Sequence, residues 1–195
     1  RQVRHAALYR PGDRVMLFLP LAHSFAKLMQ YICCIAPVEL MFPAVCDRNA
    51  SKPNPASVLK DMRESGATIF PVVPRILEKM QAGVLESAKK RNVSGLILGL
   101  ALWSARKVYG AGRRGKKAAL LTRIGFGGTA LVRARIKNRL FGKEFKYAIS
   151  GGAKLNVEVS NFFEALGMEV LEGYGLTETC VATNVNLPGR NCVGT

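Results

Sequence analysis

Short apolar runs alternate along this chain with segments in which apolar residues recur at helical spacing. The runs predict buried strands over 14–20, 38–45, 67–73, 145–150 and 168–171. The helical spacing predicts helices over 25–35, 55–65, 76–88 and 157–166. Asn54 and Asn156 are suited to cap two of these helices, and Gly66 and Gly167 supply stop signals. The alternation predicts an α/β fold in which mostly parallel sheets are flanked by helices.

Positive charge is concentrated in one segment of the chain. The 195 residues carry a net charge of +16, and between Ser87 and Lys143 there are fifteen Lys and Arg with no Asp or Glu. The spacing in this segment is helical but contains many glycines, so we expect residues 84–143 to form a basic helical insertion broken at those glycines. Such a charge favours an anionic partner, although the alternative is that the apolar side chains pack on the domain and the cations simply face water.

Two anionic partners are compatible with residues 87–143. An anionic membrane surface could accept both the cations and an apolar stripe of Val132, Ile136 and Leu140, with Arg133 and Lys137 lying off the stripe. Nucleic acid is the alternative, but the aromatic residues are few and widely spaced, and no RNA- or DNA-binding signature occurs.

The cysteine pattern and the length of the apolar runs argue against a disulfide-rich protein, a zinc protein and a membrane-spanning protein. The five cysteines form no Cys-x-x-Cys pair, so a disulfide framework or a zinc site is disfavoured. The longest apolar run, 96–103, is far shorter than the roughly 20 residues that span a bilayer. We therefore expect a cytoplasmic protein, peripheral on the cytoplasmic face of a membrane. Residues 1–8 read as the tail of a helix and 191–195 end without a closing element, which suggests a partial domain cut from a longer protein.

Two glycine-rich stretches follow predicted strands. They are SGGAKLN at 150–156 and EGYGLTETC at 172–180. Both leave the carboxyl ends of strands, where open α/β sheets bind ligands, and we expect the second to be a flexible loop wrapped around a polar, aromatic-bearing ligand. Glycine lets the backbone approach a flat ring or a phosphate, although a tight strand-to-helix turn would explain Gly151 and Gly152 equally well. In the second stretch, Glu178 is a hard oxygen ligand suited to Mg²⁺, and Thr177 offers a hydroxyl to phosphate.

These two stretches, about twenty residues apart, resemble the adenylate-forming superfamily of acyl-CoA synthetases, nonribosomal adenylation domains and luciferases. LPLAHSF at 19–25 and VVPRILEK at 72–79 resemble the long-chain fatty-acid–CoA ligase branch. The resemblance implies that 1–195 is a central fragment of the large N-terminal domain of such an enzyme. It also implies a two-step reaction in which a fatty acid carboxylate attacks the α-phosphorus of ATP, and the thiol of coenzyme A then displaces AMP from the acyl-adenylate.

The resemblance assigns roles to residues that match the family motifs. Glu178 matches a magnesium-binding glutamate and Thr177 a hydroxyl that contacts the α-phosphate, so both are candidate catalytic residues. His23 matches a histidine near the reacting carboxylate, although a lone histidine before a helix is more often a cap or a packing residue. The remaining matches are to the nucleotide site, where the backbone or side chains border adenine and the acyl channel: Gly151, Gly152, Ala153, Glu172, Gly173, Tyr174 and Gly175.

Other family features do not occur in the 195 residues. The Ser/Thr/Gly-rich phosphate loop, the aspartate that holds the ribose hydroxyls and the C-terminal domain with its catalytic lysine are absent from the sequence. We therefore expect the parent protein to be an acid–thiol ligase that uses ATP, Mg²⁺ and coenzyme A, and this chain alone to be inactive. A non-catalytic homologue that serves as a scaffold is an alternative, against which the retained Thr177 and Glu178 argue. Medium-chain or aryl substrates also remain open.

Overall fold

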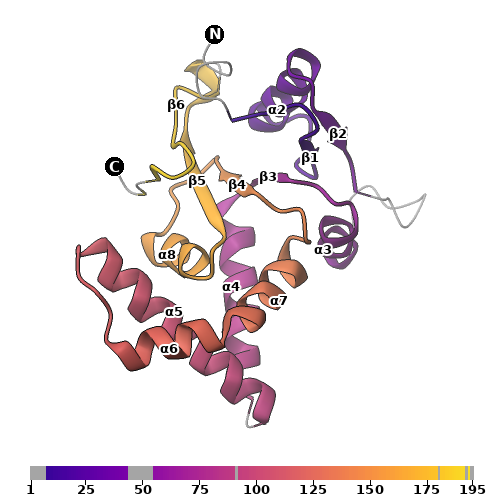
Figure 1. The fold of residues 1–195 in the computed structure, drawn as a ribbon. Helices are drawn as coiled ribbons and strands as arrows, with labels where there is room; N and C mark the ends of the chain where they lie inside the picture. The colour runs from indigo at the N-terminus through magenta and orange to yellow at the C-terminus, as the bar shows by residue number, and fades with distance from the viewer. Residues whose placement is uncertain (1–7, 44–54, 91, 180, 192, 194–195) are drawn as a thin grey trace.

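Six strands form one sheet in the part of the chain described by the structure, which is a computed structural model. It describes residues 8–43, 55–90, 92–179, 181–191 and 193. The strands are β1 (Arg14–Met16), β2 (Glu39–Met41), β3 (Ile69–Val72), β4 (Tyr147–Ser150), β5 (Glu169–Tyr174) and β6 (Asn184–Val185). Their order is β2-β1-β3-β4-β5-β6; the first five run parallel, and β6 pairs antiparallel with β5 (Figure 1). The predicted α/β fold class is therefore confirmed.

The helices lie on both faces of this sheet. They are α2 (Ser24–Ile35), α3 (Pro55–Glu64), α4 (Pro74–Ala88), α5 (Val93–Arg113), α6 (Leu120–Gly128), α7 (Ala130–Leu140) and α8 (Val157–Ala165). Successive residues of a strand face opposite sides of a sheet, and Ile69 and Ile149 pack with α2, whereas Phe70 and Ala148 pack with the larger helical layer. Two hydrophobic cores thus hold the sheet, one beneath α2 and one beneath α4, α5, α7 and α8.

Most of the predicted elements and helix boundaries are confirmed. The Oδ1 atom of Asn156 accepts a hydrogen bond from the backbone N–H of Glu158 at 2.8 Å, as expected of a cap. Gly66 and Gly167 have φ angles of +64° and +77°, which suit the ends of α3 and α8. Three strand boundaries are wrong. The strands expected over 14–20 and 38–45 end already at Met16 and Met41. The strand expected over 168–171 runs to Tyr174, because β6 pairs with its last residues.

The basic segment is less broken than its glycines suggested. Helix α5 continues for 21 residues through Gly95, Gly99, Gly110 and Gly112. Burial of Ala101, Leu102 and Ala105 against neighbouring helices compensates for the weak helix propensity of glycine. The chain turns at Gly115, where φ is +64°. The prediction that the glycines break this segment is therefore wrong for α5, and the assignment of 84–143 as an insertion stays a prediction.

The apolar stripe of α7 does not face outward. Ile136 is buried, and Val132 and Leu140 pack against the larger core. The expectation that these three side chains enter a membrane interface is therefore wrong, because they stabilise the domain. Among the helices that the structure describes, none combines the length and the apolar content of a membrane-spanning helix.

Several sequence-based predictions lie outside the described residues. These are the cap at Asn54, most of the expected helix tail at 1–8, and the thiols of Cys46, Cys180 and Cys192. Of the cysteines that are described, Cys33 is half-buried and Cys34 is exposed, and both are free thiols. Burial raises the pKa of the Cys33 thiol to about 11, so this thiol is protonated near neutral pH.

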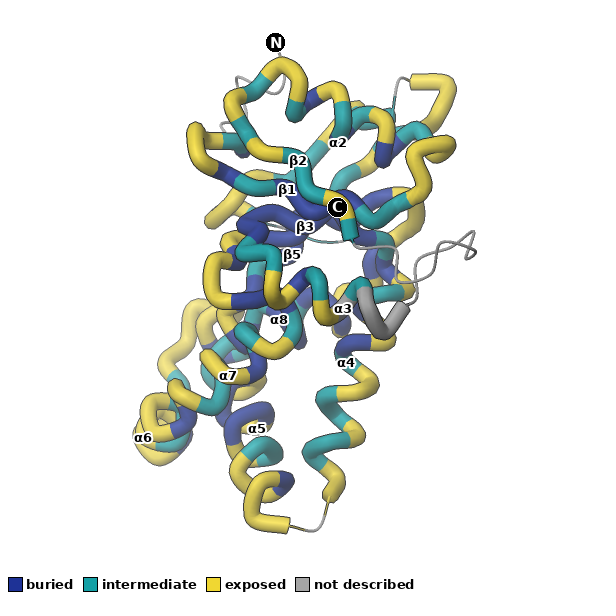
Figure 2. The backbone as a smooth tube through the Cα atoms, turned by 90° about the vertical axis from the view of Figure 1, so that its right-hand side faces the viewer, coloured by how far each residue is buried: buried dark blue, intermediate teal, exposed yellow. Residues whose placement is uncertain are grey.

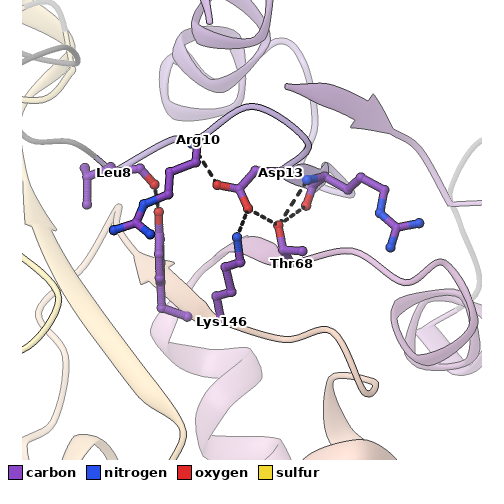
Figure 3. A network of polar contacts seen from close by, with 7 residues as sticks. Leu8, Arg10, Asp13, Thr68 and Lys146 are labelled. Atoms are coloured by element: carbon purple, nitrogen blue, oxygen red, sulfur yellow. Dashed lines mark hydrogen bonds and ion pairs between the residues drawn. The ribbon is translucent and has the colours of Figure 1, made fainter. Parts of the chain in front are cut away.

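A buried carboxylate joins three strands at their amino ends. Asp13 is 1% exposed and follows the turn at Pro11 and Gly12. It accepts hydrogen bonds from the backbone N–H of Arg10 at 2.8 Å, from Thr68 Oγ1 at 3.0 Å and from Lys146 Nζ at 2.5 Å (Figure 3). Burial by itself raises the pKa of Asp13, but the hydrogen bonds from Lys146, Arg10 and Thr68 outweigh it and hold the pKa below its ordinary value of 3.8. The network fixes the starts of β1, β3 and β4 relative to one another.

Candidate functional site

A cavity of about 910 Å³ opens at the carboxyl ends of the central strands. Three segments line it: the start of α2, the loop after β4, and the β5–β6 hairpin with the short 3₁₀ turn η1 (Thr177–Thr179). The start of α2 follows β1, the loop follows β4 and the hairpin contains β5, so the register of β1, β3, β4 and β5 fixes their separation. Eight of the ten predicted site residues line this cavity: His23, Gly151, Gly152, Gly173, Tyr174, Gly175, Thr177 and Glu178.

 The other two predicted site residues, Ala153 and Glu172, do not line the cavity.

His23 caps the helix that starts at the cavity. Its Nδ1 atom accepts a hydrogen bond from the backbone N–H of Phe25 at 3.3 Å, so one of the two roles considered from the sequence is present in the structure. The same side chain lines the cavity, and its predicted place near a reacting carboxylate stays a prediction. Ser24, the next residue, connects α2 to η1, because its hydroxyl lies 3.4 Å from the hydroxyl of Thr177.

The loop after β4 passes close to the side chain of Phe25. The backbone N–H of Gly151 donates to the carbonyl of Val72 at 3.1 Å, which continues the strand pairing into the loop. A Cβ atom on Gly151 would lie 3.3 Å from the ring of Phe25, and Gly152 has a φ of +82°. The positive φ favours glycine at 152, and the close approach of Phe25 favours a small residue at 151. The backbone of both residues borders the cavity.

Glu172 braces that loop from the neighbouring strand. Its Oε1 atom accepts a hydrogen bond from the backbone N–H of Leu155 at 2.9 Å. This contact ties the end of β5 to the start of the segment that leads into α8. The predicted contact of Glu172 with an adenine edge stays a prediction.

The stretch at 172–180 is more ordered than a flexible loop. Its first three residues belong to β5, where Gly173 pairs with Val185 and Tyr174 with Asn184. Its last described residues form η1, in which Thr179 Oγ1 accepts from the backbone N–H of Leu176 at 3.0 Å. The expectation of a flexible loop is therefore wrong, because β6 and the Thr179 hydroxyl hold the stretch in place.

Gly175 stands where no side chain fits. A Cβ atom there would lie 1.3 Å from the carbonyl oxygen of Val181. That carbonyl is held by a backbone turn, since the N–H of Val181 donates to Leu176 at 2.9 Å. Tyr174 precedes this contact and is 61% exposed, so its ring is free to contact a ligand.

The cavity has a polar rim and an apolar interior. Thr177 and Glu178 are exposed at the rim. The apolar side is formed by α2 and the sheet, with Leu28, Met29 and Ile149 among its residues. Tyr9 also lines it and donates a hydrogen bond to Met29 Sδ at 3.5 Å, and burial raises the pKa of its hydroxyl.

Sequence reasoning missed this apolar side and the β6 strand. The apolar spacing of α2 predicted a helix with a buried face but did not distinguish side chains in the core from those that line a cavity. Strand β6 has two residues in the structure, too few for a recognisable pattern.

Among the described residues that line the cavity, Glu178 is the one carboxylate available to a metal ion. Among the described residues, no group of three or more His, Cys, Asp or Glu side chains could hold one. Mg²⁺ is commonly bound by one or two carboxylates together with substrate phosphates and water. Glu178, exposed beside the hydroxyl of Thr177, fits that pattern of binding.

Solved structures share this fold. A Mycobacterium tuberculosis fatty acyl CoA synthetase matches 92% of this chain with a TM-score of 0.54 and 20% identity, over 24% of its own chain. A long-chain-fatty-acid-CoA ligase (FadD1) from Archaeoglobus fulgidus matches 97% of this chain with a TM-score of 0.57 and 13% identity, over 28% of its own chain. At these identities the likeness establishes the fold alone.

Curated relatives match at the level of sequence. The long-chain-fatty-acid–CoA ligase FadD15 of Mycobacterium bovis is 29% identical over 175 residues, which cover 90% of this chain and 27% of the relative. The peroxisomal long chain acyl-CoA synthetase 6 of Arabidopsis thaliana is 30% identical over 191 residues, which cover 94% of this chain and 24% of the relative. The chain thus spans about a quarter of the length of these relatives. The model of the AMP-binding enzyme family matches residues 1–195, and the chain belongs to that family.

Proposed function

We propose that this chain forms the central part of a long-chain fatty-acid–CoA ligase. The observation that carries the proposal is the cavity at the carboxyl ends of the strands, which combines a polar rim with an apolar interior. The reaction would join a fatty acid to coenzyme A at the expense of ATP, through an acyl-adenylate. A substrate with a charged phosphate end and a long apolar end matches a cavity of this composition.

The rim provides the nucleotide half of the site. The backbone of Gly151 and Gly152 can approach the flat face of a base, and the exposed ring of Tyr174 can lie along it. The Thr177 hydroxyl can donate to a phosphate oxygen, and its contact with Ser24 Oγ at 3.4 Å limits its rotation. These groups position the α-phosphate and need little acid–base chemistry.

Glu178 would hold Mg²⁺ at the same rim. The ion would supply positive charge against the phosphate oxygens. The carboxylate of Glu178 is exposed and follows Thr177 directly, so a metal ion bound there would lie near the phosphate that Thr177 contacts.

The interior provides the acyl half of the site. Leu28 and Met29 lie on the first turns of α2, behind the His23 cap, and Ile149 lies on β4. A fatty acid whose carboxylate lies near His23 could therefore extend its chain along α2. Burying each methylene contributes about 0.8 kcal/mol, which would favour long acyl chains over short ones.

The experiment uses the longer polypeptide that carries this chain. It is incubated with Mg-ATP, coenzyme A and fatty acids of increasing length, and acyl-CoA is detected by mass spectrometry. We expect long-chain acyl-CoA as the main product. Absence of acyl-CoA, or a preference for aryl acids, would contradict the proposal.

Two variants on one helix test the acyl half. Leu28→Gln places a polar group in the cavity and should lower turnover of long-chain acids more than that of short ones. Ile35→Gln, at a position that is 70% exposed and does not line the cavity, is the matched control and should leave the length profile unchanged. Equal effects of the two variants would contradict the placement of the acyl chain along α2.

A further inference from the structure

Exposed apolar side chains gather on two neighbouring helices of the basic segment. On α5, Leu96 is 73% exposed and Leu100 is 49% exposed; on α6, Leu121 is 83% exposed and Ile124 is 62% exposed. The two helices pack against each other. Single exposed apolar residues are common, but a set of them on packed helices marks an interaction surface.

The apolar residues of α5 form one stripe. Leu96, Leu100 and Trp103 recur at spacings of four and three residues, so they share one side of the helix. Residues on the other side, such as Ala101 and Ala105, are buried. We call the exposed side chains of Leu96, Leu100, Trp103, Leu120, Leu121 and Ile124 the α5–α6 face.

Cations continue the same stripe and border it. Lys107 lies four residues beyond Trp103 and falls on the stripe, and the exposed Arg114 follows the end of α5. Lys116 and Lys117 are exposed in the connection from α5 to α6. The segment from Ser87 to Lys143 contains no carboxylate side chain to neutralise these charges.

Two of the four cations of α7 contact other groups of the protein. Arg133 stacks on the ring of Phe126, with its Cζ atom 3.4 Å from the ring centre, and donates to Thr129 Oγ1 at 3.0 Å. The Nζ atom of Lys137 lies 5.9 Å from the ring centre of Phe145. Arg135 and Arg139 of α7 are exposed, so α7 adds two cations to those beside α5 and α6.

We propose that the α5–α6 face rests on an anionic lipid bilayer. Its apolar side chains would enter the boundary between headgroups and acyl chains, and the cations beside them would meet the phosphate headgroups. Figures 1 and 2 place α5 and α6 at the end of the molecule opposite α2, so a bilayer at this face leaves the start of α2 clear.

Charge complementarity favours this partner over the others. A second copy of the chain would bring the same positive charge to the interface, and like charges that face each other are unfavourable. A nucleic acid would use the cations but not the exposed leucines, and within the α5–α6 face Trp103 is the one aromatic ring available for stacking on a base. An anionic bilayer satisfies both the apolar and the cationic groups.

The test is co-sedimentation of the 195-residue chain with lipid vesicles. Phosphatidylcholine vesicles are compared with vesicles that also contain phosphatidylglycerol, at low and at high salt. We expect binding to the anionic vesicles, little binding to the neutral ones, and weaker binding at high salt because the charges are screened. The assay contains no ATP or fatty acid, so its outcome is independent of the proposed ligase activity.

Two pairs of variants separate the apolar and the cationic contributions. Leu96→Gln with Leu100→Gln should weaken vesicle binding on the order of 100-fold, because both side chains would leave the bilayer. The matched control is Tyr31→Gln with Ile35→Gln, which has the same spacing on α2 and exposed fractions of 55% and 70%, and it should not change binding.

The cationic pair is Lys116→Gln with Lys117→Gln. Loss of these two charges should weaken binding about 30-fold, because each charge near an anionic surface contributes about 1 kcal/mol. Lys27→Gln with Lys60→Gln, on α2 and α3, removes the same charge elsewhere and should have a smaller effect. Circular dichroism checks that every variant keeps the fold of the parent chain.

Three outcomes of the vesicle experiments would overturn the proposal. These are an absence of binding to anionic vesicles, equal binding to neutral vesicles, and equal effects of the test and control pairs. Sedimentation velocity and RNA filter binding cover the other partners. A dimer that Leu96→Gln with Leu100→Gln abolishes, or RNA binding without vesicle binding, would assign the face to a second copy or to nucleic acid.

Discussion

Removing the Asp13 carboxylate should destabilise the fold more than removing the lysine that pairs with it. Asp13 is 1% exposed and accepts three hydrogen bonds, whereas the side chain of Lys146 is 48% exposed. Asp13→Ala leaves the Arg10 N–H without its acceptor and leaves the Thr68 hydroxyl with the Arg14 carbonyl, at 3.2 Å, as its remaining acceptor. In Lys146→Met, the carboxylate keeps both of those donors.

The expected losses in the free energy of unfolding follow from these hydrogen-bond partners. Breaking a buried charge pair costs about 3–5 kcal/mol, but Lys146 can turn to water, so we expect a loss of about 2–4 kcal/mol for Asp13→Ala. Lys146→Met should cost about 1–2 kcal/mol, because it removes one charged hydrogen bond at a half-exposed position. The double variant should cost less than the sum by about 1 kcal/mol, since the two residues interact directly.

Urea unfolding of the 195-residue chain, followed by circular dichroism, measures these free energies. Equal losses for Asp13→Ala and Lys146→Met, or exact additivity in the double variant, would refute the reasoning. The pH dependence gives a second check. Because the folded pKa of Asp13 is below 3.8, its stabilising contribution is present above pH 3.8 and is lost as the pH falls through the folded pKa. The difference between the parent chain and Asp13→Ala should therefore shrink below pH 3.8.

Three further changes test the site and the sheet around it. Gly175→Ala should displace the turn at Val181 and lower ligase activity of the longer polypeptide, which steady-state kinetics would detect, because its Cβ would lie 1.3 Å from a carbonyl oxygen. Glu172→Gln should preserve the contact with the Leu155 N–H and change activity less than Glu172→Ala; equal losses would show that the contact is unimportant. Ser150→Ala should raise the melting temperature by an amount equivalent to about 1 kcal/mol, since the buried Ser150 hydroxyl has no hydrogen-bond partner among the described residues.

The sequence predicts the parts of the fold that depend on local pattern. Apolar spacing and caps locate α2, α4 and α8, because burial of one face and a cap such as Asn156 are local properties. The site motifs are also readable, since their residues follow strands of a parallel sheet and meet at one edge.

What depends on distant contacts could not be predicted. Helix α5 continues through its glycines because other helices cover it, and β5 extends to Tyr174 because β6 pairs with it. The stripe at Ile136 faces the core, and its spacing alone could not distinguish a buried face from a membrane-facing one. Lys146, which pairs with Asp13, is 133 residues away in the sequence, and no local pattern indicates this contact.

Fatty-acid-dependent exchange of pyrophosphate into ATP, measured on the longer polypeptide, tests the proposed adenylation most directly. We expect exchange with long-chain fatty acids and a loss of about 10²–10³-fold in Glu178→Ala, as when one electrostatic contact to the transition state is removed. Glu144→Ala is the matched control, because Glu144 is an exposed carboxylate that precedes β4, away from the cavity. Exchange that does not need a fatty acid, or that survives Glu178→Ala as well as Glu144→Ala, would contradict the assignment of this cavity as an adenylation site.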